Sequence, residues 1–280
     1  MKKFFFLLLI AFTANAQENS TTGPENGALV VVGGGRVGEA ITKKFIELAG
    51  GKDAKIVVIP TAAGGEIDLE KVWFANQLAA YGATNVTILH TYDKNEADSD
   101  AFVVPLKNAG AVWFGGGRQW RLVDAYSDTK TEKQIWNILN NGGVIGGSSA
   151  GATIQGSYLA RGDTQNNQIM MGDHEEGFGF IKNIAIDQHV LARNRQFDMF
   201  DILKNKPELL GIGIDESTAV VVQGDTFEVI GDSKVLIYDG TFWSREGSQL
   251  KNVPSKEALF YFLQSGDQYD MKERKVIAKE

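Results

Sequence analysis

Cysteine is missing from this 280-residue chain, and histidine occurs only three times. The missing cysteine excludes disulfides, thiolate metal sites, a cysteine nucleophile and a lipidated N-terminal cysteine. After its first dozen residues the sequence also lacks any apolar run near the roughly 20 residues that span a bilayer. The hydrophobic share of 43% and the charged share of 22% are those of a globular chain, which excludes disorder, collagen and coiled coil as the main state.

The N-terminus has the pattern of a secretory signal peptide. Lys2 and Lys3 precede the apolar run 4–12, and Ala14 and Ala16 stand where a signal peptidase reads small residues. We expect cleavage after Ala16, which makes residues 1–16 the signal. The mature protein is then expected to be soluble and exported, either periplasmic or secreted. An uncleaved anchor is the alternative.

The mature chain is expected to be one acidic domain. Residues 17–27 are polar and predict a flexible leader, and residues 28–280 are expected to form a single domain. Cleavage removes two lysines and no acid, so the net charge of −7 becomes −9. We therefore expect neither nucleic acid nor, after cleavage, a membrane among the partners. The oligomeric state stays open, with a homodimer among the options.

Short, wholly apolar runs alternate with amphipathic stretches up to about residue 150. Such runs are typical of strands buried on both faces. Their alternation with helices predicts a mainly parallel sheet covered by helices. The expected strands are Ala28–Val32, Lys55–Ile59, Val86–Leu89, Ala111–Phe114 and Gly143–Ile145.

The pattern changes after residue 150, where strands become more frequent than helices. Glycine–aspartate pairs separate the last three expected strands, as in hairpins. The expected elements are a helix over 151–159 and strands over 184–187, 210–215, 219–222, 227–230 and 235–238. We therefore predict an antiparallel extension of the sheet at its C-terminal end.

The run Gly33-x-Gly35-x-x-Gly38 follows the first strand and formally matches a dinucleotide-binding fingerprint. That fingerprint needs an acidic residue at the end of the second strand to hold a ribose. This chain has Pro60-Thr61 there. The glycines are better explained by a tight turn and by close packing of a helix on the sheet.

Gly147-x-Ser149-x-Gly151 lies between an expected strand and an expected helix, which is the context of a nucleophile elbow. The serine backbone is strained at such a corner, so the residues two positions away must be tiny. The Ser149 side chain then projects above the sheet, and the N–H of Ala150 can donate to an oxyanion. A glycine-rich turn with two capping serines is the alternative.

A second glycine run, Gly115-Gly116-Gly117, ends the strand over 111–114 at the edge where α/β sheets bind ligands. Bare backbone lets a substrate carbonyl approach an N–H closely. Gly116 or Gly117 is therefore a candidate for the second oxyanion donor. A plain strand-to-helix turn is the alternative.

The general base must come from the three histidines. His90 could be a surface residue after its strand, and His174 lies in a stretch with the composition of a solvated loop. His189 follows a buried-looking strand, downstream of Ser149, in the polar group Asp187-Gln188-His189. We therefore choose His189.

Four segments together resemble the cyanophycinase and aspartyl dipeptidase family of serine peptidases. The resemblance spans about residues 28–240 and is carried by 114–119, 146–152, 187–195 and 211–218. Gln119 and the Asp-Gln-His-x-x-x-Arg-x-Arg run look specifically like cyanophycinases. The resemblance implies a three-layer α/β/α sandwich related to the class I glutamine amidotransferases.

The same resemblance implies a Ser149 nucleophile, a His189 base and no metal or organic cofactor. It implies hydrolysis of cyanophycin, a poly-aspartate with arginine on each side-chain carboxylate, to β-aspartyl-arginine dipeptides. Arginines suit aspartyl carboxylates, and Asp187 could meet the substrate guanidinium. The residues that it places in the substrate site are Gln119, Asp187, Gln188, Arg193 and Arg195.

The resemblance also places the triad acid shortly after the nucleophile, so we choose Asp163. Its competitors in the same loop are acidic too, and a further acidic pair lies near the site by resemblance. These competitors are Asp173, Glu175 and Glu176, and the pair is Asp215 and Glu216.

Two positions depart from the family pattern. Cyanophycinases usually carry arginine where this chain has Asp198, and an acidic residue where it has Arg118. Both changes reverse the local charge, so a different β-aspartyl or acidic peptide is an alternative substrate. A further alternative is a non-catalytic binding protein on the same fold. The presence of both Ser149 and His189 argues against that alternative.

Overall fold

The computed structural model describes residues 21–252 and 254–278. The expected signal peptide lies outside these residues. Within the expected leader, the backbone N–H groups of Thr22 and Gly23 donate to the Asp225 carboxylate, and the Thr22 carbonyl accepts from the N–H of Lys182. This part of the leader is therefore bound to the fold, in contrast to the flexible leader that the sequence predicts.

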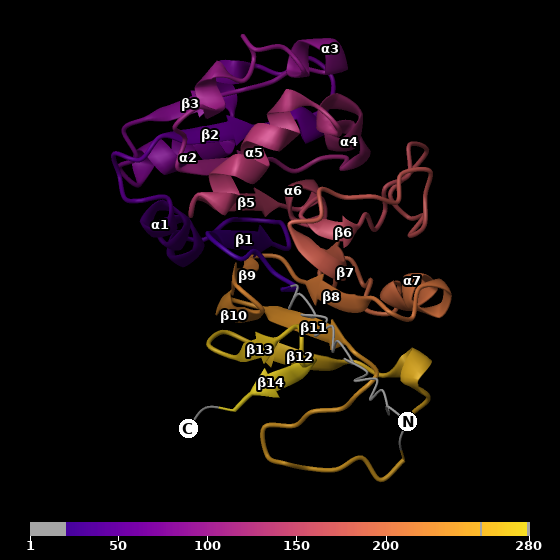
Figure 1. Ribbon diagram of the computed structural model, residues 1–280. Coiled ribbons are helices and arrows are strands. Elements are labelled where there is room, and N and C mark those ends of the chain that lie inside the picture. Colours follow the sequence, from indigo (N-terminus) through magenta and orange to yellow (C-terminus); the bar gives the residue numbers. More distant parts are fainter. Residues whose placement is uncertain (1–20, 253, 279–280) are drawn as a thin grey trace, which may run out of the picture.

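A nine-stranded sheet runs through the molecule (Figure 1). Its parallel part has the spatial order β1-β5-β4-β2-β3, and the antiparallel strands β9, β10, β13 and β14 continue it beyond β1. The bounds are β1 Ala28–Val32, β2 Ile56–Ile59, β3 Val86–Ile88, β4 Ala111–Phe114, β5 Val144–Ser148, β9 Thr218–Gln223, β10 Thr226–Gly231, β13 Gln268–Asp270 and β14 Lys275–Ile277.

Helices cover both faces of the parallel part. Alternate residues of β1 point to opposite faces: Val30 packs with α1 and α2, whereas Leu29 packs in the cluster that contains α4 and α5. The three-layer α/β/α class predicted from the sequence is thus confirmed. The helices are α1 Glu39–Leu48, α2 Trp73–Ala80, α3 Lys94–Ala97, α4 Trp120–Tyr126, α5 Lys130–Asn140, α6 Ala150–Thr153 and α7 Met199–Asn205, with 3₁₀ turns at Thr61–Ala63, Leu69–Lys71, Val104–Leu106 and Lys256–Ala258.

The sequence does not predict the second sheet, which has the order β12-β11-β8-β7-β6. Strands β6, β7 and β8 are parallel, and β11 and β12 pair antiparallel beside them. The β9–β10 hairpin extends the large sheet as predicted, but the next strand, β11, joins this second sheet. The bounds are β6 Gly156–Tyr158, β7 Ile181–Gln188, β8 Leu210–Ile214, β11 Lys234–Tyr238 and β12 Tyr261–Gln264.

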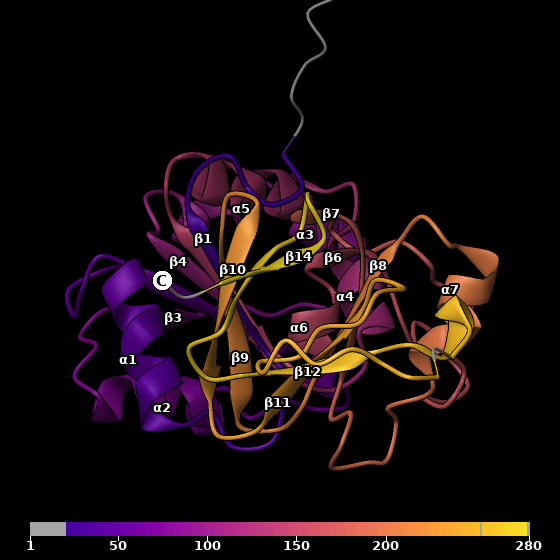
Figure 2. The same ribbon diagram turned by 90° about the horizontal axis from the view of Figure 1, so that it is seen from below.

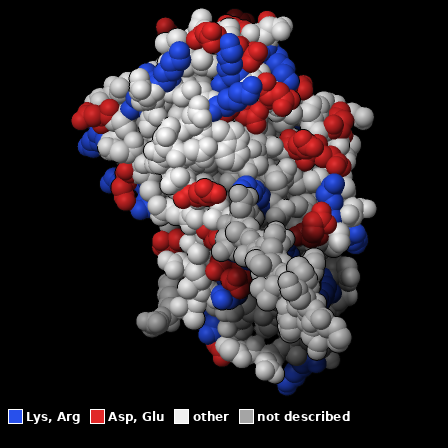
Figure 3. All heavy atoms as spheres, in the orientation of Figure 1, with Lys and Arg blue, Asp and Glu red and all other residues white. Residues whose placement is uncertain are grey.

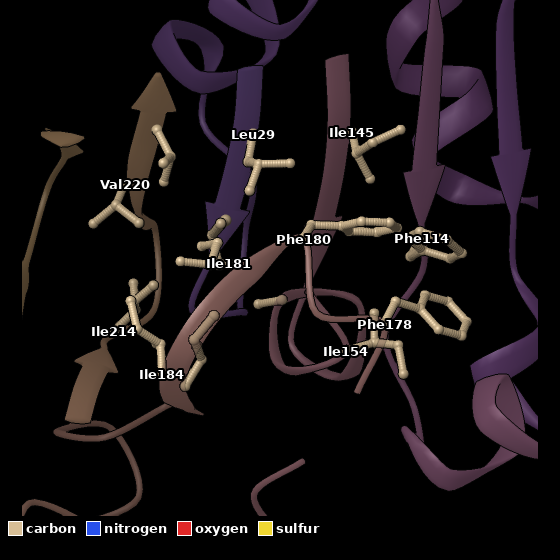
Figure 4. Packing of buried hydrophobic residues seen from close by; sticks show 14 of the residues in the cluster. Leu29, Phe114, Ile145, Ile154, Phe178, Phe180, Ile181, Ile184, Ile214 and Val220 are labelled. Carbon is tan, nitrogen blue, oxygen red and sulfur yellow. The ribbon is translucent and has the colours of Figure 1, made fainter. Parts of the chain in front are cut away.

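The two sheets share one apolar core. Figure 4 shows Leu29 and Ile145 of the large sheet on one side and Ile184 and Ile214 of the second sheet on the other. Phe180 lies between them, and all five residues are at most 1% exposed and belong to one buried cluster. Seen from below in Figure 2, the late strands β10, β11, β12 and β14 lie in front of the parallel strands β1 and β4.

The carboxyl ends of five strands supply the loops that matter for function. In the large sheet, β1, β4 and β5 are parallel neighbours or near neighbours, and Val32 of β1 is paired with Ser148 of β5. In the second sheet, Gln188 ends β7 opposite Ile214 at the end of β8. The residues that follow these ends meet in one place, which is described next.

Candidate active site

Ser149 stands at the sharp turn between β5 and α6. Its backbone angles are φ 58° and ψ −111°, in a region that residues other than glycine rarely occupy. A Cβ added to Gly147 would collide with the carbonyl of Gly151, and one added to Gly151 would collide with the carbonyl of Phe114. The small residues on both sides are thus required for the turn to close.

His189 meets the serine hydroxyl from the second sheet. It follows β7 directly, with a positive φ of 55°, and its Nε2 lies 2.9 Å from Ser149 Oγ. Its Nδ1 lies 2.5 Å from Glu216 Oε1. A carboxylate only accepts hydrogen bonds, so Nδ1 carries the proton and Nε2 is free to accept from the serine O–H.

The surroundings of His189 favour its neutral form. Burial lowers the pKa of His189 below its ordinary value, and the positive charges of Arg193 and Arg195 act in the same direction, while Glu216 opposes them. The His189 side chain is 6% exposed. A neutral imidazole that touches a serine hydroxyl is chemically a proton acceptor.

The acid that contacts the histidine is Glu216, whereas the sequence predicts Asp163. Asp163 Oδ1 accepts the backbone N–H groups of Gln165 at 2.8 Å and Asn166 at 3.2 Å. The Asp163 carboxylate therefore closes a turn of its own loop, and the second nitrogen of the imidazole is already occupied by Glu216. Glu216 follows β8 closely, and β8 is the strand beside β7. The resemblance placed Glu216 near the site, but the sequence did not show that these two strands pair.

The Gly116 backbone lies close to the serine side chain. A Cβ placed on Gly116 would lie 3.4 Å from Ser149 Cβ and 3.9 Å from Ser149 Oγ, so the Gly116 backbone passes beside the hydroxyl. Among the backbone hydrogen bonds of the described residues, none is donated by Gly116, Gly117 or Ala150. These three are the donors predicted from the sequence, and their role as oxyanion donors stays a prediction.

The residues expected to bind substrate differ in how much of them a ligand can reach. Arg193 is exposed, whereas Arg195 is buried and points two weak hydrogen bonds, of 3.3 and 3.4 Å, at Gln188. Gln119 is buried as well, and its amide donates to the carbonyl of Ala160 at 2.6 Å. Of these side chains, Arg193 presents its charge most openly.

The expectation that Asp187 meets a substrate guanidinium is wrong, because Arg161 of this chain already fills that role. Arg161 Nε and Nη2 donate to the two oxygens of Asp187 at 2.7 and 2.9 Å, and both side chains are at most 1% exposed. Arg161 also donates to Asp198 at 2.6 Å. The sequence reasoning missed Arg161, although the unusual acid at 198 was a signal that a cation lay nearby.

Comparison with known proteins assigns the chain to a family. The model of Peptidase family S51 matches residues 29–230. This chain belongs to peptidase family S51. Cyanophycinases of Geminocystis herdmanii and of a Nostoc species are similar to it, with 31% identity over 90% of this chain and 96% of the relative, and 28% over 94% and 92%.

A solved structure supports the same assignment. The crystal structure of a peptidase from an acI-B1 actinobacterium covers 89% of this chain and 98% of its own, with 28% identity and a TM-score of 0.64. The predicted resemblance is thus confirmed, and this S51 member is a serine-type peptidase, a hydrolase.

Acidic and basic side chains are interspersed on the face of the S51 peptidase that Figure 3 shows.

In residues 21–252 and 254–278, no cluster of three histidine, aspartate or glutamate side chains could hold a metal ion. Among the same residues, none of the helices has the length and hydropathy needed for a membrane span.

Proposed function

We propose that this chain is an exported S51 peptidase of the cyanophycinase type, which hydrolyses a β-aspartyl polymer or peptide through Ser149, His189 and Glu216. One observation carries the proposal: His189 joins the serine hydroxyl at 2.9 Å to the Glu216 carboxylate at 2.5 Å. That order of groups is the arrangement by which a histidine activates a serine.

The reaction follows from this geometry. His189 Nε2 takes the proton of Ser149 as Oγ attacks the scissile carbonyl, and Glu216 stabilises the resulting imidazolium. The N–H groups of Ala150 and of Gly116 or Gly117 hold the developing oxyanion. His189 then gives the proton to the leaving amine. In the second half of the reaction His189 takes a proton from water as the water attacks the acyl-enzyme, and it returns that proton to Ser149 Oγ as the acid product leaves. The strained turn at Ser149 supports its assignment as a nucleophile elbow.

The substrate side of the proposal rests on charge. Arg193 is exposed near the histidine, and its charge is felt there, since it lowers the pKa of His189. A carboxylate of an aspartyl substrate is a fitting partner for such an arginine. Cyanophycin itself is the first candidate substrate, because the similar curated proteins are cyanophycinases.

A second candidate, a hydrolase of other β-aspartyl peptides, is favoured by one observation. The carboxylate that would receive the arginine of cyanophycin, Asp187, is engaged by Arg161, together with Asp198. The arginyl group of the polymer then lacks this carboxylate as a partner, so the enzyme would not require arginine in its substrate.

Purified mature protein should be incubated with cyanophycin, a β-aspartyl-arginine dipeptide, β-aspartyl dipeptides without arginine, and a simple ester. Release of dipeptide from the polymer alone supports the first candidate, and cleavage of the other β-aspartyl peptides supports the second. Cleavage of none of them would overturn the proposal.

Ser149→Ala is expected to abolish hydrolysis, with a loss on the order of 10⁶-fold in kcat, while the melting temperature stays close to that of the parent. Ser148→Ala, which removes the adjacent hydroxyl at the end of β5, is the matched control and should stay active. Full activity of Ser149→Ala would contradict the mechanism.

Export is tested separately. The protein is expressed with its first 16 residues, and the exported fraction is sequenced from its N-terminus. We expect it to begin at Gln17; a chain that keeps Met1 and stays inside the cell would overturn this part of the proposal.

A further inference from the structure

The glycine turn after β1, Gly33-Gly34-Gly35, has no part in the chemistry described so far. It lies at the end of the central strand, between β5 on one side and β9 on the other. Gly34 has φ +120° and Gly35 has φ +63°, which are both in the range that favours glycine. Because these backbone angles favour glycine, the turn depends on glycine at both positions.

Three consecutive carbonyls at this turn accept hydrogen bonds from the backbones of the three catalytic segments. Ser149 and His189 themselves donate to two of them, and the third accepts from the residue that follows Glu216. The bonds are Ser149 N–H to Val32 O at 3.0 Å, His189 N–H to Gly33 O at 2.9 Å, and Ser217 N–H to Gly34 O at 3.0 Å.

The same turn also contacts two of the catalytic side chains. A Cβ on Gly34 would overlap the imidazole of His189, at 2.5 Å from Nε2 and 2.7 Å from Nδ1. A Cβ on Gly35 would lie 2.7 Å from Glu216 Oε2 and 2.8 Å from Glu216 Cβ. The imidazole of His189 and the carboxylate of Glu216 therefore pack directly against the backbone of these two glycines.

We propose that residues Val32–Gly35 are the positioning element of this peptidase. They align Ser149, His189 and Glu216, which come from two different sheets, by three backbone hydrogen bonds to Val32, Gly33 and Gly34 and by the space that the missing side chains of Gly34 and Gly35 leave. This inference rests on the proposed catalytic roles. Strand β5, which precedes Ser149, is in the large sheet, whereas β7 and β8, which precede His189 and Glu216, are in the second sheet. No strand pairing therefore links Ser149 to the other two residues, and the turn after β1 supplies that link.

The test uses Gly35→Ala with Gly65→Ala as its matched control. Gly65 has φ +68°, it is exposed like Gly35, and a Cβ there meets nothing within 4 Å. Both substitutions thus impose nearly the same backbone strain, but only the first presses on Glu216. We expect Gly35→Ala to lose about 10²-fold in kcat, as a small misplacement of reacting groups does, with KM changed by less than about twofold. Gly65→Ala should keep the parental values.

A second measurement does not depend on any substrate. The proton shared by His189 and Glu216 should give a low-field proton NMR resonance, which is retained in Gly65→Ala and shifted or lost in Gly35→Ala. If the parent protein cleaves no substrate but this resonance responds as expected, the positioning inference stands while the proposed function fails.

Asparagine adopts the left-handed region more readily than alanine, so Gly35→Asn and Gly65→Asn form a second pair should the alanine variant not fold. The inference is overturned if either Gly35 variant keeps the parental kcat and resonance. It is also overturned if the Gly65 variants lose as much activity as the Gly35 variants, because backbone strain alone would then explain the loss.

Discussion

Ser149 carries a backbone conformation whose cost is of order 1–3 kcal/mol. The cost is offset by the hydrogen bond of its N–H to Val32 and by its carbonyl, which accepts the N–H groups of Ala152 and Thr153. A strained residue that its neighbours hold in place by several hydrogen bonds is typical of a functional position.

Glu216 and Asp163 can be separated by substitution. Glu216→Gln removes the carboxylate that fixes the His189 tautomer, so we expect kcat to fall by about 10³–10⁴-fold with the fold intact. Asp163→Asn keeps a side-chain oxygen for the turn at 165–166 and should change kcat by less than about tenfold. Steady-state kinetics and circular dichroism of the two variants provide the check, and the reverse ranking would restore Asp163 as the acid.

Burial and Arg193 both lower the pKa of His189. A histidine base works only when neutral, so kcat/KM should rise with pH through this lowered pKa, with the acid limb below the ordinary histidine value near 6.5. Arg193→Ala removes a positive charge, so the acid limb should move to higher pH. Lys204→Ala, on α7, is the control; an acid limb unmoved in Arg193→Ala would contradict this electrostatic account.

At the scale of elements, the sequence predicts a helix over 151–159, but α6 ends at Thr153. Thr153 and Ile154 are β-branched and Gly156 follows, all of which weaken a helix. Gly156–Tyr158 instead pairs with β7 as strand β6. This early end turns the chain from the large sheet into the second one, from which His189 and Glu216 return to the site.

The loop between β6 and β7 is fastened to α4 through His174. Its Nε2 lies 2.9 Å from Asp124 and its Nδ1 lies 3.0 Å from Asp173. Burial lowers the pKa of His174, but the two carboxylates outweigh it and leave the pKa raised. A raised folded-state pKa stabilises the fold fully below the unfolded value near 6.5, and this contribution is lost as pH rises through the folded value.

His174→Gln should therefore lose stability relative to the parent at acidic pH and converge with it at alkaline pH. Chemical denaturation of both proteins across this range, with Gln168→Ala in the same loop as a control, measures the difference. A difference that does not change with pH would show that the histidine contributes by packing rather than by charge.

At the scale of the whole molecule, one buried cluster includes residues of both sheets, among them Leu29, Ile145, Ile184 and Ile214. Elements that share a core lose their packing together, so we predict a single calorimetric transition for the mature chain. Ile184→Ala should cost about 2–5 kcal/mol and lower that one transition. Two separate transitions, of which Ile184→Ala moves only one, would contradict the single domain expected for residues 28–280.

Local pattern alone determined a large part of this protein. Apolar runs of four or five residues placed β1, β2 and β4, because a strand buried on both faces leaves no polar positions. For β5 the predicted strand 143–145 shares only residues 144 and 145 with the observed Val144–Ser148. The spacing of Gly147, Ser149 and Gly151 marked the strained turn, since the steric demand is set by residues two positions away. The polar group at 187–189 singled out the histidine.

Only the tertiary structure decided which acid meets that histidine and where the late strands pair. Glu216 lies 27 positions from His189 and is brought to it by the parallel pairing of β7 with β8, and β11 leaves the large sheet to pair with β8. Nor could the sequence show that Arg161 pairs with Asp187 or that the backbone N–H groups of Ser149, His189 and Ser217 donate to the turn after β1. Pairing between strands and contacts between distant side chains depend on the sum of many long-range contacts, and no local pattern encodes that sum.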